Sequence, residues 1–131
     1  SVMGMMASID DIQELEKLIG QLKSLHSEIG LLARKSPNDA VNDFKLKMIN
    51  RTVERANALL GSEFVPYEDF KGFEKDDLPS NSDVTMVISQ YLEEAERYRS
   101  YHVVMSKGRY VYKVGGNVTD VHAASPTWSK K

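Results

Sequence analysis

Three basic residues at helical spacing form the first candidate site for chemistry. Lys47, Arg51 and Arg55 recur every four residues, so a helix places them in one row along its surface. Such a row can hold phosphate or carboxylate groups through charge-assisted hydrogen bonds, in which each arginine offers a bidentate fork. Together with Tyr91 or Tyr98, the row predicts a binding site for an anionic small molecule or a nucleotide.

The same row has a structural alternative. Asp43 lies four residues before Lys47, which is the spacing of an ion pair on a helix. Segment 62–82 is rich in acidic residues that can pair with Arg51 and Arg55. The row then serves only to cover apolar surface with its side-chain stems. Ligand binding therefore depends on whether the row is open or covered.

A second candidate lies in residues 97–102, whose sequence RYRSYH places a histidine after an arginine. This pattern resembles the motif of HEPN ribonuclease domains, which are small helical bundles that cleave RNA at a dimer interface. The resemblance implies that Arg97 and His102 are a metal-independent catalytic pair. It covers six residues: Tyr98 stands where the family has a small polar residue, and a β-hairpin follows in place of more helix. Five helical steps separate the pair by about 140°, so Arg99 shares the His102 side.

Histidine and acidic residues give no metal or cofactor motif. His26 lies in the apolar stripe of the first predicted helix and His102 closes that of the third, so we expect both to be buried structural residues. No H-x-x-x-H or H-E-x-x-H pair is present. The acidic run 74–83 lacks the central glycine and the alternating ligands of an EF-hand. We therefore predict no metal and no cofactor.

Aromatic residues near the C-terminus predict a protein-binding surface. Tyr110 and Tyr112 alternate along a predicted strand over residues 109–114 and can form a hot spot for a partner protein or a stacking platform. Those that face inward pack across strands on the helices instead. The edge of a short hairpin can pair with a strand of another chain, which favours a homodimer or peptide capture.

Apolar residues along the first predicted helix form another candidate interface. Ser8, with Asp11 three residues later, predicts the N-cap of this helix. The apolar residues follow the a/d spacing of a coiled coil: Leu15, Leu18, Leu22, Leu25, Ile29 and Leu32. We predict that Leu15, Leu22 and Ile29 take part in a dimer interface. The alternative is that this stripe packs antiparallel on the next helix of the same chain.

The second predicted helix covers residues 37–60. Ser36 is its expected N-cap, Pro37 suits its first position, and Gly61 can end it in the left-handed conformation. Apolar residues cover more than half of its circumference, so we expect contacts on two of its sides. The link 33–38 is short enough to fold the two helices into a helical hairpin.

Segment 62–82 is long for a connection and has no sustained period. It carries aromatic residues at three-residue steps: Phe64, Tyr67, Phe70 and Phe73. This apolar area can offset the entropy cost of ordering the segment, so we expect an ordered loop on the helices, with a helical turn within 67–73. Ser80 or Ser82 then caps an amphipathic third helix.

A β-hairpin completes the predicted fold. Gly115 and Gly116 supply the positive φ angles of a two-residue turn, so residues 109–114 and 117–122 form antiparallel strands. A lone hairpin is marginally stable in water. It must therefore pack on the helices, pair with residues 103–105 or join a second subunit.

Composition narrows the class of protein. The net charge of −2 gives no global positive field for nucleic acid or anionic lipid. The absence of cysteine excludes disulfides and thiolate chemistry and suits the cytoplasm. No segment has the apolar length of a membrane span, and the N-terminus has no signal-peptide pattern. We expect one domain over residues 8–122, a disordered or vector-derived segment 1–7 and a flexible tail 123–131.

These patterns together predict a mainly helical α+β fold, with a long helical hairpin, a third amphipathic helix, an ordered aromatic loop and a C-terminal antiparallel β-hairpin. The predicted function is that of a small cytoplasmic interaction or adaptor protein, homodimeric and non-enzymatic, which binds a partner protein and no membrane. Nucleic acid is a disfavoured partner. The first alternative is a binding module for an anionic small molecule or nucleotide. The second is a HEPN-like ribonuclease.

Overall fold

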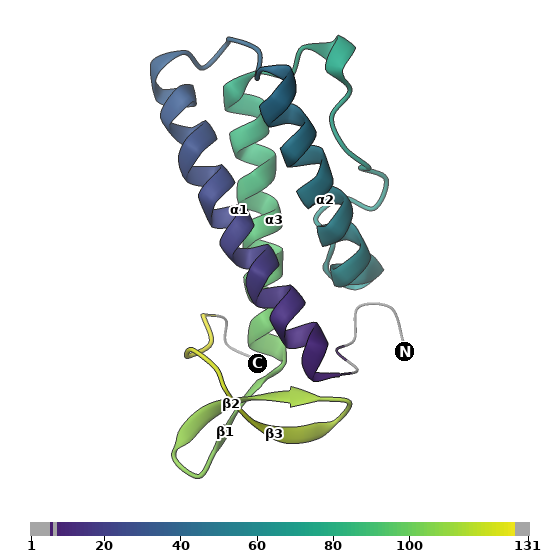
Figure 1. The fold of residues 1–131 in the computed structure, drawn as a ribbon, viewed down its shortest axis with the longest axis vertical. Helices are drawn as coiled ribbons and strands as arrows, with labels where there is room; N and C mark the ends of the chain where they lie inside the picture. Colours follow the sequence, from purple (N-terminus) through teal and green to yellow (C-terminus); the bar gives the residue numbers. More distant parts are fainter. Residues whose placement is uncertain (1–5, 7, 128–131) are drawn as a thin grey trace.

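A bundle of three helices carries a small antiparallel sheet at one end (Figure 1). The computed structural model describes residues 6 and 8–127. In chain order its elements are α1 (Ile9–Lys35), α2 (Asp43–Phe64), the 3-10 helix η1 (Lys75–Asp77), α3 (Asn81–Tyr101), β1 (Val103–Ser106), β2 (Arg109–Val114) and β3 (Asn117–His122). The predicted α+β architecture is confirmed. Most of segment 1–7 lies outside the described residues, whereas Met6 is buried in the core.

The apolar stripe of α1 points into the protein's own core. Ser8 precedes the helix, and its N–H donates to Asp11 Oδ2 at 3.1 Å, as expected for the predicted cap. Leu15, Leu22 and Ile29 are at most 1% exposed. The stripe packs within the chain, but α1 lies mainly against α3 rather than α2. The predicted partner α2 also contacts α1, but less extensively than α3 does.

The prediction that α2 starts at Pro37 was wrong. Asn42 caps the helix instead, because its Oδ1 accepts the N–H of Lys45 at 2.8 Å. The preceding link pairs with the chain that enters α3, and the N–H of Val41 donates to Pro79 O at 2.9 Å. Hydrogen bonds between distant segments thus outweigh the local signal of the proline.

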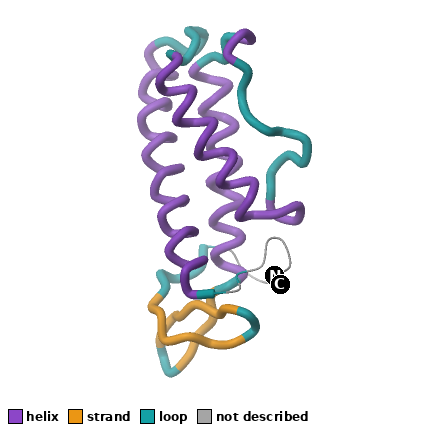
Figure 2. Tube along the Cα trace, turned by 45° about the vertical axis from the view of Figure 1, so that its right-hand side comes forward, coloured by secondary structure: helices purple, strands orange, loops and turns teal. Residues whose placement is uncertain are grey.

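Gly61 interrupts α2 at the position where the helix was predicted to end, but a further turn follows it to Phe64. The φ of 71° and ψ of 178° at Gly61 are not helical, and glycine adopts a positive φ without steric cost. The last turn, which ends at Phe64, leaves at an angle to the rest of the helix (Figure 2).

α3 is the central helix of the bundle. It packs on both α1 and α2, and its contact with α1 is the most extensive between any two helices of the bundle. Ser80 is its N-cap, with Oγ accepting the N–H of Asp83 at 3.1 Å. Tyr91 and Tyr98 are at most 1% exposed. The second helix was expected to be contacted on two of its sides, but Phe44 on its outward face is 71% exposed.

Two asparagines of α2 fix the aromatic loop (residues 65–80) on the bundle. Asn50 Nδ2 donates to Phe73 O at 2.9 Å, and Asn50 Oδ1 accepts the N–H of Phe73 at 2.8 Å. Asn57 Nδ2 donates to Phe70 O at 3.0 Å. These bonds satisfy the loop backbone that runs beside α2 (Figure 2), so the loop is ordered as predicted.

A single hydrogen-bonded turn lies within the predicted range, where the N–H of Phe70 donates to Tyr67 O at 3.4 Å, but the 3-10 helix of the loop lies further along the chain. η1 covers Lys75–Asp77 rather than residues 67–73. The rings of Tyr67, Phe70 and Phe73 pack edge-on in succession instead, with centroid distances of 6.4 and 5.1 Å. Ring packing, together with the asparagine bonds, therefore orders the middle of the loop.

The predicted hairpin is part of a three-stranded meander in the order β1-β2-β3. Gly115 and Gly116, with φ of 58° and 80°, form the turn between β2 and β3. Val103 of β1 pairs with Tyr112 of β2, which confirms pairing with residues 103–105 among the three possibilities. The sheet is joined to α1 because Tyr112 Oη donates to Glu16 Oε2 at 3.0 Å.

Candidate functional site

Lys47, Arg51 and Arg55 lie along the outward side of α2. Ile49 and Val53 on the opposite side of the helix are at most 1% exposed. Lys47 and Arg51 are exposed, whereas Arg55 is half-buried. Residues four apart share one face of a helix, so the basic row lies on one side of α2 while Ile49 and Val53 lie on the other. The aromatic loop therefore does not cover the first two members of the row.

Arg51 and Arg55 of the row, but not Lys47, border a groove between α1 and α2. The groove has a volume of about 640 Å³. Its lining consists of Lys17, Gly20, Gln21, Ser24 and Leu25 from α1 and Met48, Arg51, Thr52 and Arg55 from α2. Three of these residues are cationic, and none of the described lining residues is acidic. Positive charge is thus concentrated in one concave space.

Arg55 is held at the edge of this groove by α1. Its guanidinium donates to Gln21 Oε1 at 2.7 Å and to Glu14 Oε2 at 3.2 Å. The Arg55 and Glu14 side chains are 36% and 59% exposed, so their ion pair adds little stability but orients the guanidinium. Within the part of the chain that the structure describes, Lys17 and Arg51 form no ion pair. Their charges are available to a ligand.

A second groove separates α2 from the aromatic loop, and Arg51 borders both grooves. Its volume is also about 640 Å³. Its charged lining residues are Asp43, Lys47, Arg51, Glu54, Lys71, Glu74 and Lys75. Asp43 binds Lys75 at 3.0 Å, so the alternative in which Asp43 neutralises Lys47 is not what the structure contains. Because acids and bases alternate here, this groove attracts an anion less strongly than the first.

Tyr91 and Tyr98 line neither groove. Tyr91 Oη donates to Asn57 Oδ1 at 2.7 Å, and the Tyr98 ring packs edge-on against Phe64 at 5.2 Å. Burial raises the pKa of both phenols to about 12. Both side chains therefore serve the core, away from the basic row they were predicted to join.

The residues predicted to form a dimer interface are mostly enclosed within one chain. Leu15, Leu22 and Ile29 are at most 1% exposed and pack in the core of the bundle. Tyr112 is 1% exposed, and Tyr110 is half-buried against the core. Of the five predicted interface residues, Tyr110 keeps part of its surface exposed.

Arg97 and His102 have different surroundings. Arg97 is 49% exposed and pairs with Glu94 at 3.5 Å on its own helix. His102 is 6% exposed, its ring lies 4.6 Å from that of Tyr98, and its Nδ1 donates to Tyr98 O at 2.9 Å. One side chain is thus directed to solvent and the other into the core.

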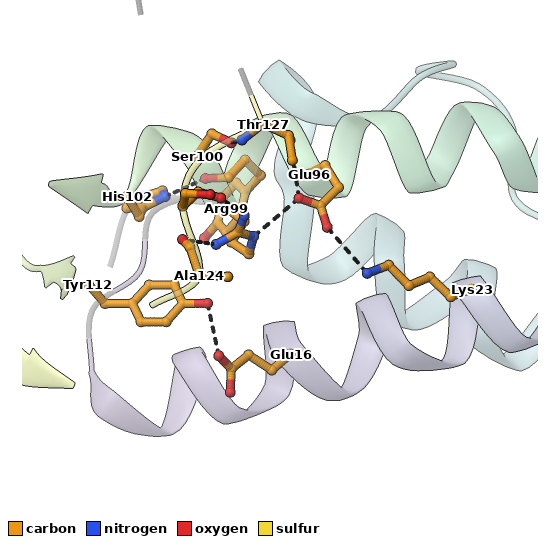
Figure 3. A network of polar contacts seen from close by, with 11 residues as sticks. Glu16, Lys23, Glu96, Arg99, Ser100, His102, Tyr112, Ala124 and Thr127 are labelled. Atoms are coloured by element: carbon orange, nitrogen blue, oxygen red, sulfur yellow. Dashed lines mark hydrogen bonds and ion pairs between the residues drawn. The ribbon is translucent and has the colours of Figure 1, made fainter. Parts of the chain in front are cut away.

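A polar network attaches the C-terminal segment (residues 123–127) to α3 (Figure 3). Arg99 is 6% exposed, and its guanidinium donates to Ala124 O at 3.0 Å, Ser125 O at 2.8 Å and Glu96 Oε2 at 3.2 Å. The described part of the predicted flexible tail is therefore bound to the bundle. Its remainder, with Trp128, lies outside the described residues.

The α1 side of the first groove was not predicted from the sequence. Lys17, Gln21 and Ser24 follow one another at steps of four and three residues, so they share one face of α1. This spacing could have predicted a polar face beside the apolar stripe. It carries no sign that the face lies opposite Arg51 and Arg55.

Metal sites, membrane-spanning helices and comparisons with known proteins give no further evidence on the function. Among residues 6 and 8–127, no three His, Asp or Glu side chains are grouped so as to hold a metal ion. None of the helices described here is both long and apolar enough to cross a bilayer. The chain matches no protein-family model, no curated protein and no solved structure.

Proposed function

We propose that the chain is a cytoplasmic, non-enzymatic binding protein that holds an anionic ligand in the groove between α1 and α2. The observation that carries this proposal is the convergence of Lys17, Arg51 and Arg55 on one concave space without an acidic lining residue among those described. Like charges gathered on one concave surface raise the local concentration of an anion. A cytoplasmic location agrees with the absence of cysteine.

The size and lining of the groove support a small molecule as the ligand. A volume of about 640 Å³ falls in the usual range of ligand pockets. Gln21 and Ser24 supply neutral polar groups that can orient a ligand, while Leu25 and Met48 supply apolar surface. No histidine or carboxylate is present among the described lining residues, so the commonest general acids and bases are missing from the groove.

Isothermal titration calorimetry with inorganic phosphate, sulfate and citrate tests the proposal. We expect at least one anion to bind the wild-type protein and Arg51→Gln to weaken its affinity about 10- to 100-fold, because a charge-assisted hydrogen bond is lost. Arg109→Gln is the matched control, since Arg109 is a half-exposed arginine on β2. Equal affinities of the wild type and Arg51→Gln, or no binding of any of the three anions, would contradict the proposal.

A homodimer formed through the sheet is the second candidate. β1 and β3 are the edge strands, and they carry Met105 and Val118, which are 57% and 56% exposed. Exposed apolar residues on an edge strand favour pairing with another copy or with a strand of a partner protein. This surface would give the chain the adaptor role expected from its sequence, without use of the buried stripe of α1.

Multi-angle light scattering across micromolar concentrations tests the dimer. We expect a dimeric mass that Met105→Lys reduces, because a charge on the edge opposes strand pairing. Met86→Lys on α3 is the matched control, since Met86 is 55% exposed and distant in sequence from the sheet. A monomeric mass at every concentration would remove this candidate.

A further inference from the structure

The charges of the α1–α2 groove also indicate the class of ligand, an inference that rests on the anion binding proposed above. We infer that the ligand carries a phosphomonoester in its dianionic form, bound by Lys17, Arg51 and Arg55, and that its apolar body lies along Leu25 and Met48. Nucleotides and phosphorylated lipids share this chemistry.

The balance of charge favours a dianion over a monoanion. Three cationic side chains line the groove, but Arg55 is already paired with Glu14, so Lys17 and Arg51 are the two without an ion pair among the described residues. A carboxylate or sulfate ester neutralises one of these charges, whereas a dianionic phosphate neutralises two. The planar fork of Arg51 can bind two phosphate oxygens at once, and the ammonium of Lys17 can bind the third.

The neutral donors of the groove also match a phosphate. Gln21 Oε1 accepts a bond from Arg55 at 2.7 Å, so its amide group keeps two N–H donors for a ligand. Ser24 adds a hydroxyl on the same face of α1. A phosphomonoester offers three strong acceptor oxygens. A carboxylate offers two and would leave more of these donors without a partner.

The rest of the groove has room for an apolar body. Leu25 and Met48 are half-buried, so part of their apolar surface faces the groove. Gly20 presents bare backbone, and a Cβ there would meet no atom within 4 Å. Inorganic phosphate would leave this apolar surface in water, whereas an ester with an apolar body would cover it.

Phosphate ionisation makes the inference testable by pH. A phosphomonoester passes from one negative charge to two with a pKa of about 6. The charged groups that face the site are Glu14, Lys17, Arg51, Glu54 and Arg55, and α3 contributes none of the described lining residues. Histidine, which ordinarily titrates in this range, is not among them. A change in affinity between about pH 5 and 7.5 therefore reports on the ligand.

Phenyl phosphate and phenyl sulfate are the probes, because they share a ring and differ in charge. By calorimetry we expect phenyl phosphate to bind more tightly at about pH 7.5 and to lose affinity about tenfold at pH 5, where only about a tenth of it is dianionic. Phenyl sulfate should bind equally at both pH values. Arg51→Gln should weaken both esters, and Arg109→Gln should weaken neither.

The outcomes separate this inference from the proposed function. Equal affinity for the two esters, or phenyl phosphate binding that does not change with pH, contradicts the inference that the ligand binds as a dianion. Either result leaves the proposed anion binding intact. If inorganic phosphate binds as tightly as phenyl phosphate, the inference that the ligand has an apolar body is contradicted. Binding of neither ester nor any simple anion overturns both proposals. Adenosine monophosphate and dihexanoyl phosphatidate then distinguish a nucleotide from a lipid, and the tighter of the two supports its own class.

Discussion

Asn50→Ala tests whether one side chain holds the aromatic loop on α2. Asn50 donates to Phe73 O at 2.9 Å and accepts the N–H of Phe73 at 2.8 Å, much as a neighbouring strand would. Alanine removes both bonds. It leaves a partly buried backbone donor and acceptor without their partner on α2.

The expected loss follows from these two bonds. Each partly buried backbone group that loses its bond costs about 1–2 kcal/mol, so the two cost about 2–4 kcal/mol. The better helix propensity of alanine returns about 0.6 kcal/mol. Asn50→Ala should therefore lower the free energy of unfolding by about 1.5–3.5 kcal/mol.

Urea denaturation measures this loss, and hydrogen exchange at the Phe73 amide locates it. Asn38→Ala is the control, because Asn38 is exposed in the link before α2 and should change stability by less than about 0.5 kcal/mol. A loss below about 0.5 kcal/mol for Asn50→Ala, with the Phe73 amide still protected, would show that other contacts hold the loop.

Three further perturbations test the packing. Arg99→Met should lower the unfolding free energy, measured by urea denaturation, by about 3 kcal/mol. The variant loses the buried guanidinium that donates to the Glu96 carboxylate and to two carbonyl groups of the C-terminal segment. Gly72→Ala should lower the unfolding free energy by more than about 1 kcal/mol, since the φ of Gly72 is 150° and the new Cβ would lie 3.0 Å from Asn50 Oδ1. Gly20→Ala is its control: the new Cβ meets no atom within 4 Å, so this variant should stabilise α1 by up to about 1 kcal/mol. The unfolding free energy should fall as the pH rises from 10 towards about 12. Burial raises the folded-state pKa of three tyrosines to about 12, so the same tyrosines ionise at lower pH in the unfolded chain. These tyrosines are Tyr91, Tyr98 and Tyr112. The absorbance of tyrosinate during denaturation checks this prediction.

Local patterns predicted those features that a single segment decides. Gly61 and the pair Gly115 and Gly116 have positive φ, where only the local backbone is at issue. α2 starts instead at the Asn42 cap, and the link before it is held by a hydrogen bond between Val41 and Pro79, far apart in the sequence. No signal near residue 37 could reveal that pairing.

The apolar stripe of α1 shows a second feature that the sequence alone could not decide. Leu15, Leu22 and Ile29 have the spacing of any buried helix seam, and burial against another chain or against the same chain requires the same residue types. Only the tertiary arrangement, with α3 against α1, shows what covers these side chains. The sequence could not separate a dimer seam from a core.

The candidate site was predictable on one helix only. Arg51 and Arg55 share a face of α2 because of helical periodicity, which the sequence contains. The position of Lys17 and Gln21 across from them depends on how α1 and α2 pack on α3. That register is set by core packing over the whole bundle, so the second half of the groove required the structure.

Amide chemical-shift mapping most directly tests whether the α1–α2 groove binds an anion. Isotope-labelled protein is titrated with phenyl phosphate at neutral pH. The largest shifts should fall on residues 17–25 and 48–55, and Arg51→Gln should abolish them at the same ligand concentration. Shifts centred on the sheet or on the aromatic loop, or no shifts at all, would contradict the account.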